Sequence, residues 1–147
     1  MAVGEYPFPE MHPVAGVKLT AVSAGIKKPG RRDVVLFELA EGSQVAGVFT
    51  LNAFCAAPVT VCKKHLAAAP IRYLVINSGN ANACTGERGM QDCQEMSRLA
   101  SAACGEQEPA TLVMSTGVIG VFLPMEKIAN GAKLAAEKMG SDEAAFL

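Results

Sequence analysis

The first third of the chain alternates short apolar runs with polar turns. Residues 17–24 mix apolar and small side chains, residues 34–40 are rich in β-branched and aromatic ones, and residues 44–50 form a third such run. Runs of this length bounded by turn residues are typical of strands. Because only brief turns, at 27–33 and 41–43, separate them, the pattern predicts an antiparallel meander of three strands.

The remainder of the chain changes to helical spacing of its apolar residues. A helix is predicted to begin at Pro58, with Lys63, Lys64 and His65 on its polar side. Two strand–loop–helix units follow it, with strands at 71–76 and 112–114 and loops at 77–82 and 115–120. Successive units of this kind favour parallel pairing through a right-handed crossover. We therefore expect both loops at the same carboxyl edge of the sheet, where open α/β sheets place ligands.

Composition narrows the class of protein. The 147 residues are 50% hydrophobic with a mean hydropathy of +0.26, which suits one domain with a buried core. Thirteen Lys and Arg against 14 Asp and Glu give a net charge of -1, so no general attraction to nucleic acid or to an anionic membrane is expected. The one basic run, 27–32, surrounds a Pro-Gly pair and is interpreted as a solvated turn. The N-terminal residues do not resemble a secretory signal and no apolar run is long enough for a membrane span, so a cytoplasmic protein is expected.

Five cysteines and two histidines offer a limited set of reactive groups. The cysteines form no C-x-x-C pair, which argues against a disulfide framework and against a zinc site. Cys84 precedes a predicted helix, whose dipole could activate its thiol as the nucleophile of a cysteine hydrolase. No histidine lies near it in the sequence, so a packing role is favoured and the nucleophile stays an alternative.

The apolar run at 112–114 ends in Ser115-Thr116-Gly117 and, after two apolar residues, Gly120. A tight loop of this kind leaves peptide N–H groups free beside hydroxyl donors, a combination suited to a phosphate or to the oxyanion of a tetrahedral acyl intermediate. The glycine spacing matches neither the dinucleotide nor the P-loop pattern. From the pattern alone, Thr116 could equally cap a helix, and the asparagines of 77–82 are interpreted as loop-structural rather than substrate-binding.

Four segments of the chain carry a family resemblance, and it extends over essentially the whole sequence. Residues 115–120, 77–86, 23–27 and 47–50 resemble the N-terminal part of the bacterial ornithine acetyltransferases, also called bifunctional arginine biosynthesis proteins. The resemblance implies an α/β fold with a mixed sheet and covering helices, of the self-processing type that uses an N-terminal threonine.

The resemblance also implies a reaction. In that family a precursor cuts itself at an Ala–Thr bond, and the freed threonine moves acetyl from N-acetylornithine to glutamate through an acetyl-threonine intermediate. A threonine activated by its own α-amino group needs no histidine. The family's oxyanion hole carries over onto the Thr116 side chain and the Gly117 amide, whereas no substrate-binding residue is assigned in this chain.

The family resemblance also implies that this chain holds only part of the active site. The one Ala–Thr bond, Ala110-Thr111, lacks the Gly-rich run that precedes cleavage, so the nucleophile is expected beyond Leu147. Residues 1–147 are thus expected to be a single domain, the N-terminal part of the alpha chain, interrupted within a helix that starts at 141–147. We expect no activity from this chain alone. The partner would be a beta chain with the threonine, in a heterotetramer without metal or bound cofactor, and acetyl-CoA is a candidate cosubstrate. The alternative is a stand-alone α/β ligand-binding module.

Overall fold

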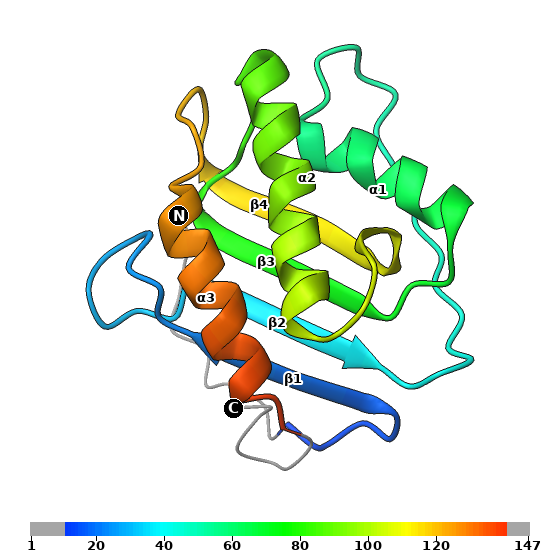
Figure 1. Cartoon of the computed structure of the whole chain (residues 1–147). Coiled ribbons are helices and arrows are strands. Elements are labelled where there is room, and N and C mark those ends of the chain that lie inside the picture. Colours follow the sequence, from blue (N-terminus) through cyan, green and yellow to red (C-terminus); the bar gives the residue numbers. More distant parts are fainter. Residues whose placement is uncertain (1–10, 141–147) are drawn as a thin grey trace.

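The computed structural model describes residues 11–140, which form one sheet with helices packed on it (Figure 1). Its elements are β1 (Val17–Val22), β2 (Val34–Leu39), α1 (Ala57–Ala68), β3 (Tyr73–Asn80), α2 (Gly86–Ala103), the short 3-10 helix η1 (Glu108–Ala110), β4 (Thr111–Val118) and α3 (Met125–Glu137). The helix start predicted at 141–147 lies outside the described residues.

The sheet is mixed, with the strand order β1-β2-β3-β4. β1 pairs with β2 and β2 with β3 in the antiparallel sense, whereas β3 and β4 run parallel. The hairpin of the first two strands and the parallel pairing of the two later units are therefore confirmed, as is the expected class of mixed sheet with helices.

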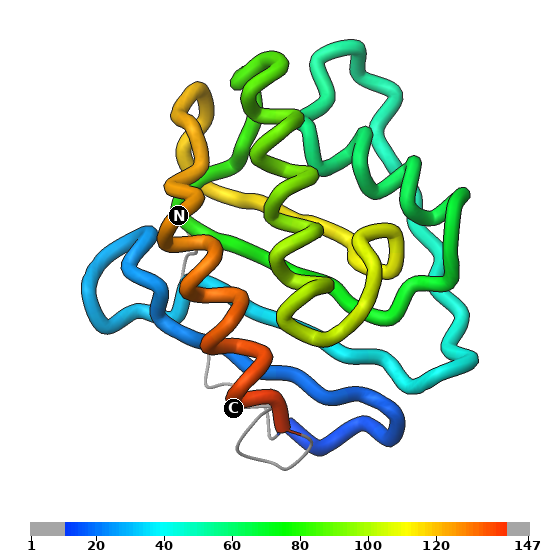
Figure 2. The backbone as a smooth tube through the Cα atoms, in the orientation of Figure 1, coloured from blue at the N-terminus to red at the C-terminus, as the bar shows by residue number. Residues whose placement is uncertain are grey.

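The strand predicted at 44–50 is wrong. These residues form neither helix nor strand, and the tube in Figure 2 follows them around the outside of the molecule from β2 to α1. Both edges of β2 are already occupied, by β1 and by β3, so this segment has no strand edge of β2 to join. Val45 and Phe49 instead pack against a small cluster formed by Cys62, Ile71 and Leu112.

The three α-helices cover one face of the sheet (Figure 1). Strand residues that alternate toward this face, such as Leu36 and Val75, are fully buried with Met96 of α2 and Ile128 of α3. Burial of large apolar side chains of this kind contributes about 1.5–3 kcal/mol each. The core therefore fixes β3 and β4 firmly beneath α2 and α3.

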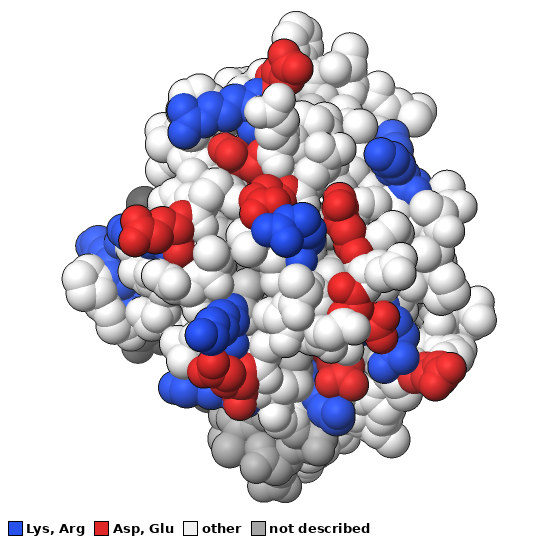
Figure 3. Space-filling model, in the orientation of Figure 1, with Lys and Arg blue, Asp and Glu red and all other residues white. Residues whose placement is uncertain are grey.

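Charged side chains of both signs are interspersed over the helical side of the molecule (Figure 3). Such mixing agrees with the net charge of -1 and gives this face no extended field of one sign. None of the helices in the described part of the chain is long and apolar enough to cross a membrane.

Candidate active site

The parallel pair β3 and β4 brings the two predicted loops together. Asn77 pairs with Ser115, Ser78 with Thr116, and Gly79 with Gly117. Both segments emerge at the same carboxyl edge, as expected, but they continue the strands instead of forming separate loops, because the ladder extends to Asn80 and Val118. The site residues are thus held by the sheet itself.

Gly117 is the point of closest approach between the two strands. Its φ is +135°, and a Cβ built on it would overlap the carbonyl carbon of Gly79 and lie 2.6 Å from the Asn80 nitrogen. Real Cβ atoms essentially never come this close to backbone, so only glycine fits. Gly79, with φ +103°, is therefore a site residue that the sequence pattern did not single out.

Regular strand alternation predicts that the Gly117 amide faces away from β3. The backbone N–H and carbonyl groups of residues two positions apart on a strand point to the same edge of that strand. Both the N–H and the carbonyl of Val113 face the outer edge of β4, where they bond the Cys62 thiol at 3.3 and 3.1 Å. By this alternation, we expect the amides of Ser115 and Gly117 to face the outer edge as well. Ser115 lines a cavity there with Pro58 and Val59 of α1, whereas Gly117 is exposed. Thr116 and Gly117 are both exposed, so this edge offers one hydroxyl and one amide donor side by side.

The side-chain N–H groups of the asparagines in β3 and the following turn donate to backbone carbonyls. Asn77 Nδ2 donates to the Asn80 carbonyl at 2.9 Å, and Asn80 Nδ2 donates to the carbonyls of Val121 and Phe122 at 2.8 and 2.9 Å. Asn82 Nδ2 donates to the Gly89 carbonyl at 2.8 Å. All three asparagines are buried, which supports the loop-structural interpretation over a substrate-binding one.

Asp33 is a second anchor at this edge. Its carboxylate accepts hydrogen bonds from the amides of Ala24 and Ile26, both at 2.6 Å, and from that of Lys27 at 3.1 Å. Its own carbonyl accepts the Ser78 amide at 2.8 Å, which ties the turn to β3. The basic side chains of the turn are exposed, as predicted, but Asp33 is buried.

The five cysteines differ in exposure: Cys84 is exposed, Cys55 and Cys104 are intermediate, and Cys62 and Cys93 are buried. Cys84 has φ +56° and lines a pocket of about 190 Å³ together with Cys55. Cys93 is fully buried, and burial raises the pKa of its thiol to about 12, while burial raises that of Cys104 to about 11. Thiols with pKa values raised this far are not suited to act as nucleophiles at neutral pH.

A base for Cys84 is not evident. His65, which was predicted on the polar side of α1 with Lys63 and Lys64, is buried, and its Nδ1 lies 2.7 Å from the Thr111 carbonyl. Within residues 11–140, no hydrogen bond joins Cys84 to a histidine. Over the same range, no group of three or more His, Cys, Asp or Glu side chains could hold a metal ion.

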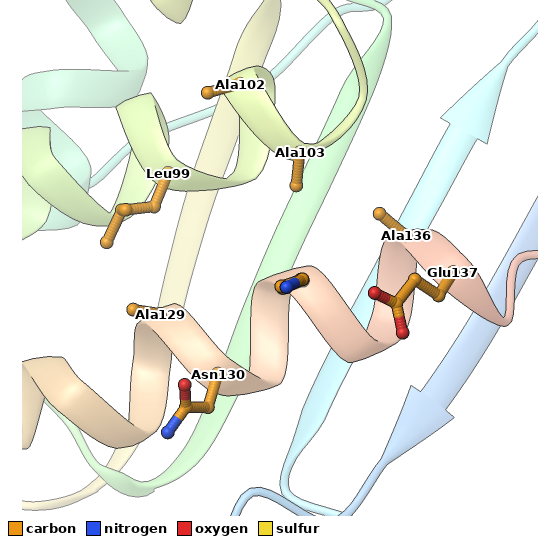
Figure 4. Close-up of a pocket in the computed structure, with 8 residues that line it drawn as sticks. Leu99, Ala102, Ala103, Ala129, Asn130, Ala136 and Glu137 are labelled. Carbon is orange, nitrogen blue, oxygen red and sulfur yellow. The ribbon is translucent and has the colours of Figure 1, made fainter.

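A groove of about 630 Å³ between α2 and α3 lies away from this edge (Figure 4). Figure 4 shows Leu99, Ala102 and Ala103 of α2 on one side and Ala129 and Ala136 of α3 on the other. Small apolar side chains dominate the lining, and none of the candidate donors contributes to it. We therefore place the site at the β3–β4 edge.

Comparisons with known proteins point to one family. The ArgJ family model matches residues 18–146. The arginine biosynthesis bifunctional protein ArgJ of Pseudomonas fluorescens is 51% identical over 142 residues, and that of Pseudomonas syringae pv. tomato is 50% identical. These matches cover 97% of this chain but 35% of each relative, so the chain spans about a third of the length of the curated relatives it matches.

Solved structures share the fold. The ornithine acetyltransferase of Mycobacterium tuberculosis, crystallised with ornithine, superposes with a TM-score of 0.86 at 34% identity, over 91% of this chain and 72% of that one. ArgJ of Bacillus halodurans gives a TM-score of 0.84 at 33% identity, over 90% and 68% of the two chains. The expected fold and the family resemblance are both confirmed: the chain belongs to the ArgJ family.

Proposed function

We propose that this chain supplies the oxyanion-binding side of an acetyltransferase active site in arginine biosynthesis. The observation that supports the proposal is that Thr116 and Gly117 are adjacent and exposed at the carboxyl end of β4, where a hydroxyl and an amide can act as neighbouring donors. Close approach to Gly79 fixes their backbone before any substrate arrives. Donors organised in advance are the most effective way to stabilise a developing oxyanion.

The reaction has two acyl-transfer steps. A threonine hydroxyl from the remainder of the polypeptide attacks the acetyl carbonyl of N-acetylornithine; the C–N bond breaks, and ornithine leaves with the proton that the threonine α-amino group removed. The amine of glutamate then attacks the acetyl-threonine ester and restores the hydroxyl. Each step passes through a tetrahedral oxyanion, which Thr116 and Gly117 stabilise. The ornithine bound to the Mycobacterium tuberculosis relative supports this choice of substrate.

The proposed active site also needs a threonine nucleophile from outside this chain. This chain matches about a third of the length of its ArgJ relatives. We propose that the nucleophile lies in the remaining two thirds, on a beta chain that joins this one in a heterotetramer. The proposed chemistry requires no metal or bound cofactor. Acetyl-CoA would present the same carbonyl to the same donors and is a candidate second acetyl source.

A chimaeric protein tests the proposal. In it, this chain replaces the matched 142 residues of the Pseudomonas fluorescens relative, and ornithine release from N-acetylornithine is measured with glutamate as acceptor. We expect turnover by the chimaera and none by this chain alone. Turnover by the pure chain, or a folded and processed chimaera without activity, would contradict the proposal. Binding of ornithine by the chain alone, with an inactive chimaera, would favour the stand-alone binding module.

A further inference from the structure

Four apolar side chains directly follow the candidate oxyanion donors and are exposed to solvent. Val118 is 58% exposed, Ile119 64%, Val121 52% and Phe122 45%. We call residues 118–122 the apolar ridge. It stands out from the body of the molecule at the end of β4, before α3 begins (Figure 1). Adjacent exposed apolar side chains of this size mark interaction sites more often than isolated ones do.

The ridge is held in a fixed conformation. The Ala81 amide donates to the Val118 carbonyl at 2.9 Å, and the Gly120 amide donates to the Ala83 carbonyl at 2.8 Å. The Asn80 side chain bonds the carbonyls of Val121 and Phe122 from the other side. A surface ordered in advance loses little conformational entropy when a partner binds.

A cavity of about 230 Å³ opens beside the ridge. Its lining includes Ile26 of the β1–β2 turn, Gly79 of β3, and Val118, Val121 and Phe122 of the ridge. The lining is mostly apolar, and the space suits one or two apolar side chains of a partner. Pockets of this kind, filled by an anchor side chain, contribute most of the binding energy in protein interfaces.

Charged groups border the ridge without entering it. The Arg88 guanidinium lies 4.0 Å from the centre of the Phe122 ring, and Lys127, which also lines the cavity, donates to the Gly25 carbonyl at 2.6 Å. Both charges are positive, and Arg88 is already paired with the Asp92 carboxylate at 3.9 Å. The partner that fits this surface is therefore apolar at its centre, with an acidic group at the rim beside Lys127.

We propose that the apolar ridge and its cavity are the docking surface for the part of the ArgJ polypeptide that carries the threonine nucleophile. This inference rests on the proposed function. Two thirds of the length of the relatives lies outside the matched region, so a large partner is available. Because the ridge begins at the residue after Gly117, a segment seated on it lies beside the donors and keeps water from them, which strengthens their interaction with an oxyanion.

Co-purification tests the docking surface. The tagged chain is produced together with the untagged remainder of the Pseudomonas fluorescens relative, and the amount of remainder retained per tagged chain is measured. We expect Ile119→Asp to retain at least about tenfold less than the unmodified chain, because a carboxylate would be buried in an apolar interface. Ile119→Leu is the matched control and should retain as much as the unmodified chain.

Two further measurements distinguish a failure of the docking surface from a failure of the proposed function. Thermal unfolding of the Ile119→Asp chain should be unchanged, because the Ile119 side chain is mostly exposed. Thr116→Val should retain the remainder fully, and its turnover in the chimaera then reports on the proposed function alone. Full retention by Ile119→Asp, or failure of the unmodified chain to retain the remainder, would overturn the docking surface, whatever the activity of Thr116→Val.

Discussion

Gly79 of β3 and Gly117 of β4 lie opposite each other with no room for a side chain between them. Each also has a positive φ, a backbone conformation that favours glycine. The missing Cβ of Gly117 lets the two backbones approach, whereas a Cβ on Gly79 would meet the Ile26 side chain at 3.1 Å. The backbone of Thr116 and Gly117 is therefore placed by the sheet. This relationship links the fold to the proposed chemistry, and it is open to direct test.

Gly117→Ala should destabilise the chain by more than the cost of holding an alanine at a positive φ. The added Cβ would overlap the Gly79 carbonyl, so the strands must separate. Gly120→Ala is the control, because Gly120 also has positive φ, +78°, but its Cβ would meet nothing within 4 Å. We expect about 1 kcal/mol from Gly120→Ala and at least about 2–3 kcal/mol from Gly117→Ala, measured by urea unfolding. Equal losses would contradict the close approach.

Asn80→Asp should loosen the apolar ridge. The substitution removes the two N–H donors to Val121 and Phe122 and sets a carboxylate against their carbonyls. We expect a loss of about 1–3 kcal/mol in the free energy of unfolding and faster hydrogen exchange at the Gly120 amide. Asn130→Asp, at an exposed position of α3, is the matched control and should change neither quantity. Unchanged exchange in Asn80→Asp would show that this side chain does not order the ridge.

Removal of the Asp33 carboxylate should disturb the turn beside the site. Asp33→Ala leaves three amide donors, those of Ala24, Ile26 and Lys27, without their acceptor. Loss of partially buried hydrogen bonds to a charged group predicts a decrease of about 2–3 kcal/mol in the free energy of unfolding. Asp33→Asn retains one acceptor oxygen and should lose less. Chemical denaturation of both variants measures the difference, and equal stability to the unmodified chain would show that the turn does not depend on this carboxylate.

Thiol reactivity separates the cysteine hydrolase alternative from the proposed function. In the folded chain, iodoacetamide should modify exposed Cys84 well before buried Cys93, as peptide mass analysis would show. Cys84→Ala should leave the turnover of the chimaera unchanged within about twofold, since the proposed mechanism assigns no step to this thiol. Abolished turnover would instead favour a catalytic cysteine.

Stability should fall at high pH. Burial raises the pKa of Cys93 to about 12 from the ordinary value of 9.0, so this thiol stays neutral in the folded chain while it ionises in the unfolded one. Above pH 9 the unfolded state therefore loses a proton that the folded state keeps, and the free energy of unfolding decreases by up to about 1.4 kcal/mol per pH unit for this group. Urea unfolding between pH 8 and pH 11 measures the slope. Cys93→Ala should show a smaller slope, and an unchanged one would contradict this assignment.

The local sequence pattern was sufficient to predict the strands and helices that carry the candidate site. The helical spacing around Cys93 and Met96, and the apolar runs before Asn77 and Ser115, predicted two parallel strand–loop–helix units, because periodicity and turn residues are local properties. The strand predicted at 44–50 failed for a non-local reason: β2 already has neighbours on both edges. Sequence alone does not show which strand edges are occupied.

The same limit applies to the site. The local pattern left Thr116 equally open to an anion-binding role and to a helix-capping role, and the family resemblance decided between them. The contribution of Gly79 depends on a partner 38 positions later in the chain, as the register of β3 and β4 shows. His65 was likewise predicted on a polar helix face, yet it is buried against the Thr111 carbonyl. Each of these roles is set by a contact between distant segments.

The rate of acetyl transfer in the chimaera, with Thr116→Val compared with Thr116→Ser, tests the central claim most directly. Valine has nearly the shape of threonine but no hydroxyl, whereas serine keeps the donor. The proposed oxyanion hole predicts that Thr116→Val lowers kcat by about 10²–10³-fold without loss of folding, while Thr116→Ser keeps most of the activity. A Thr116→Val chimaera with kcat within about twofold of the unmodified one would show that the hydroxyl at the open edge of β4 does not stabilise the reaction.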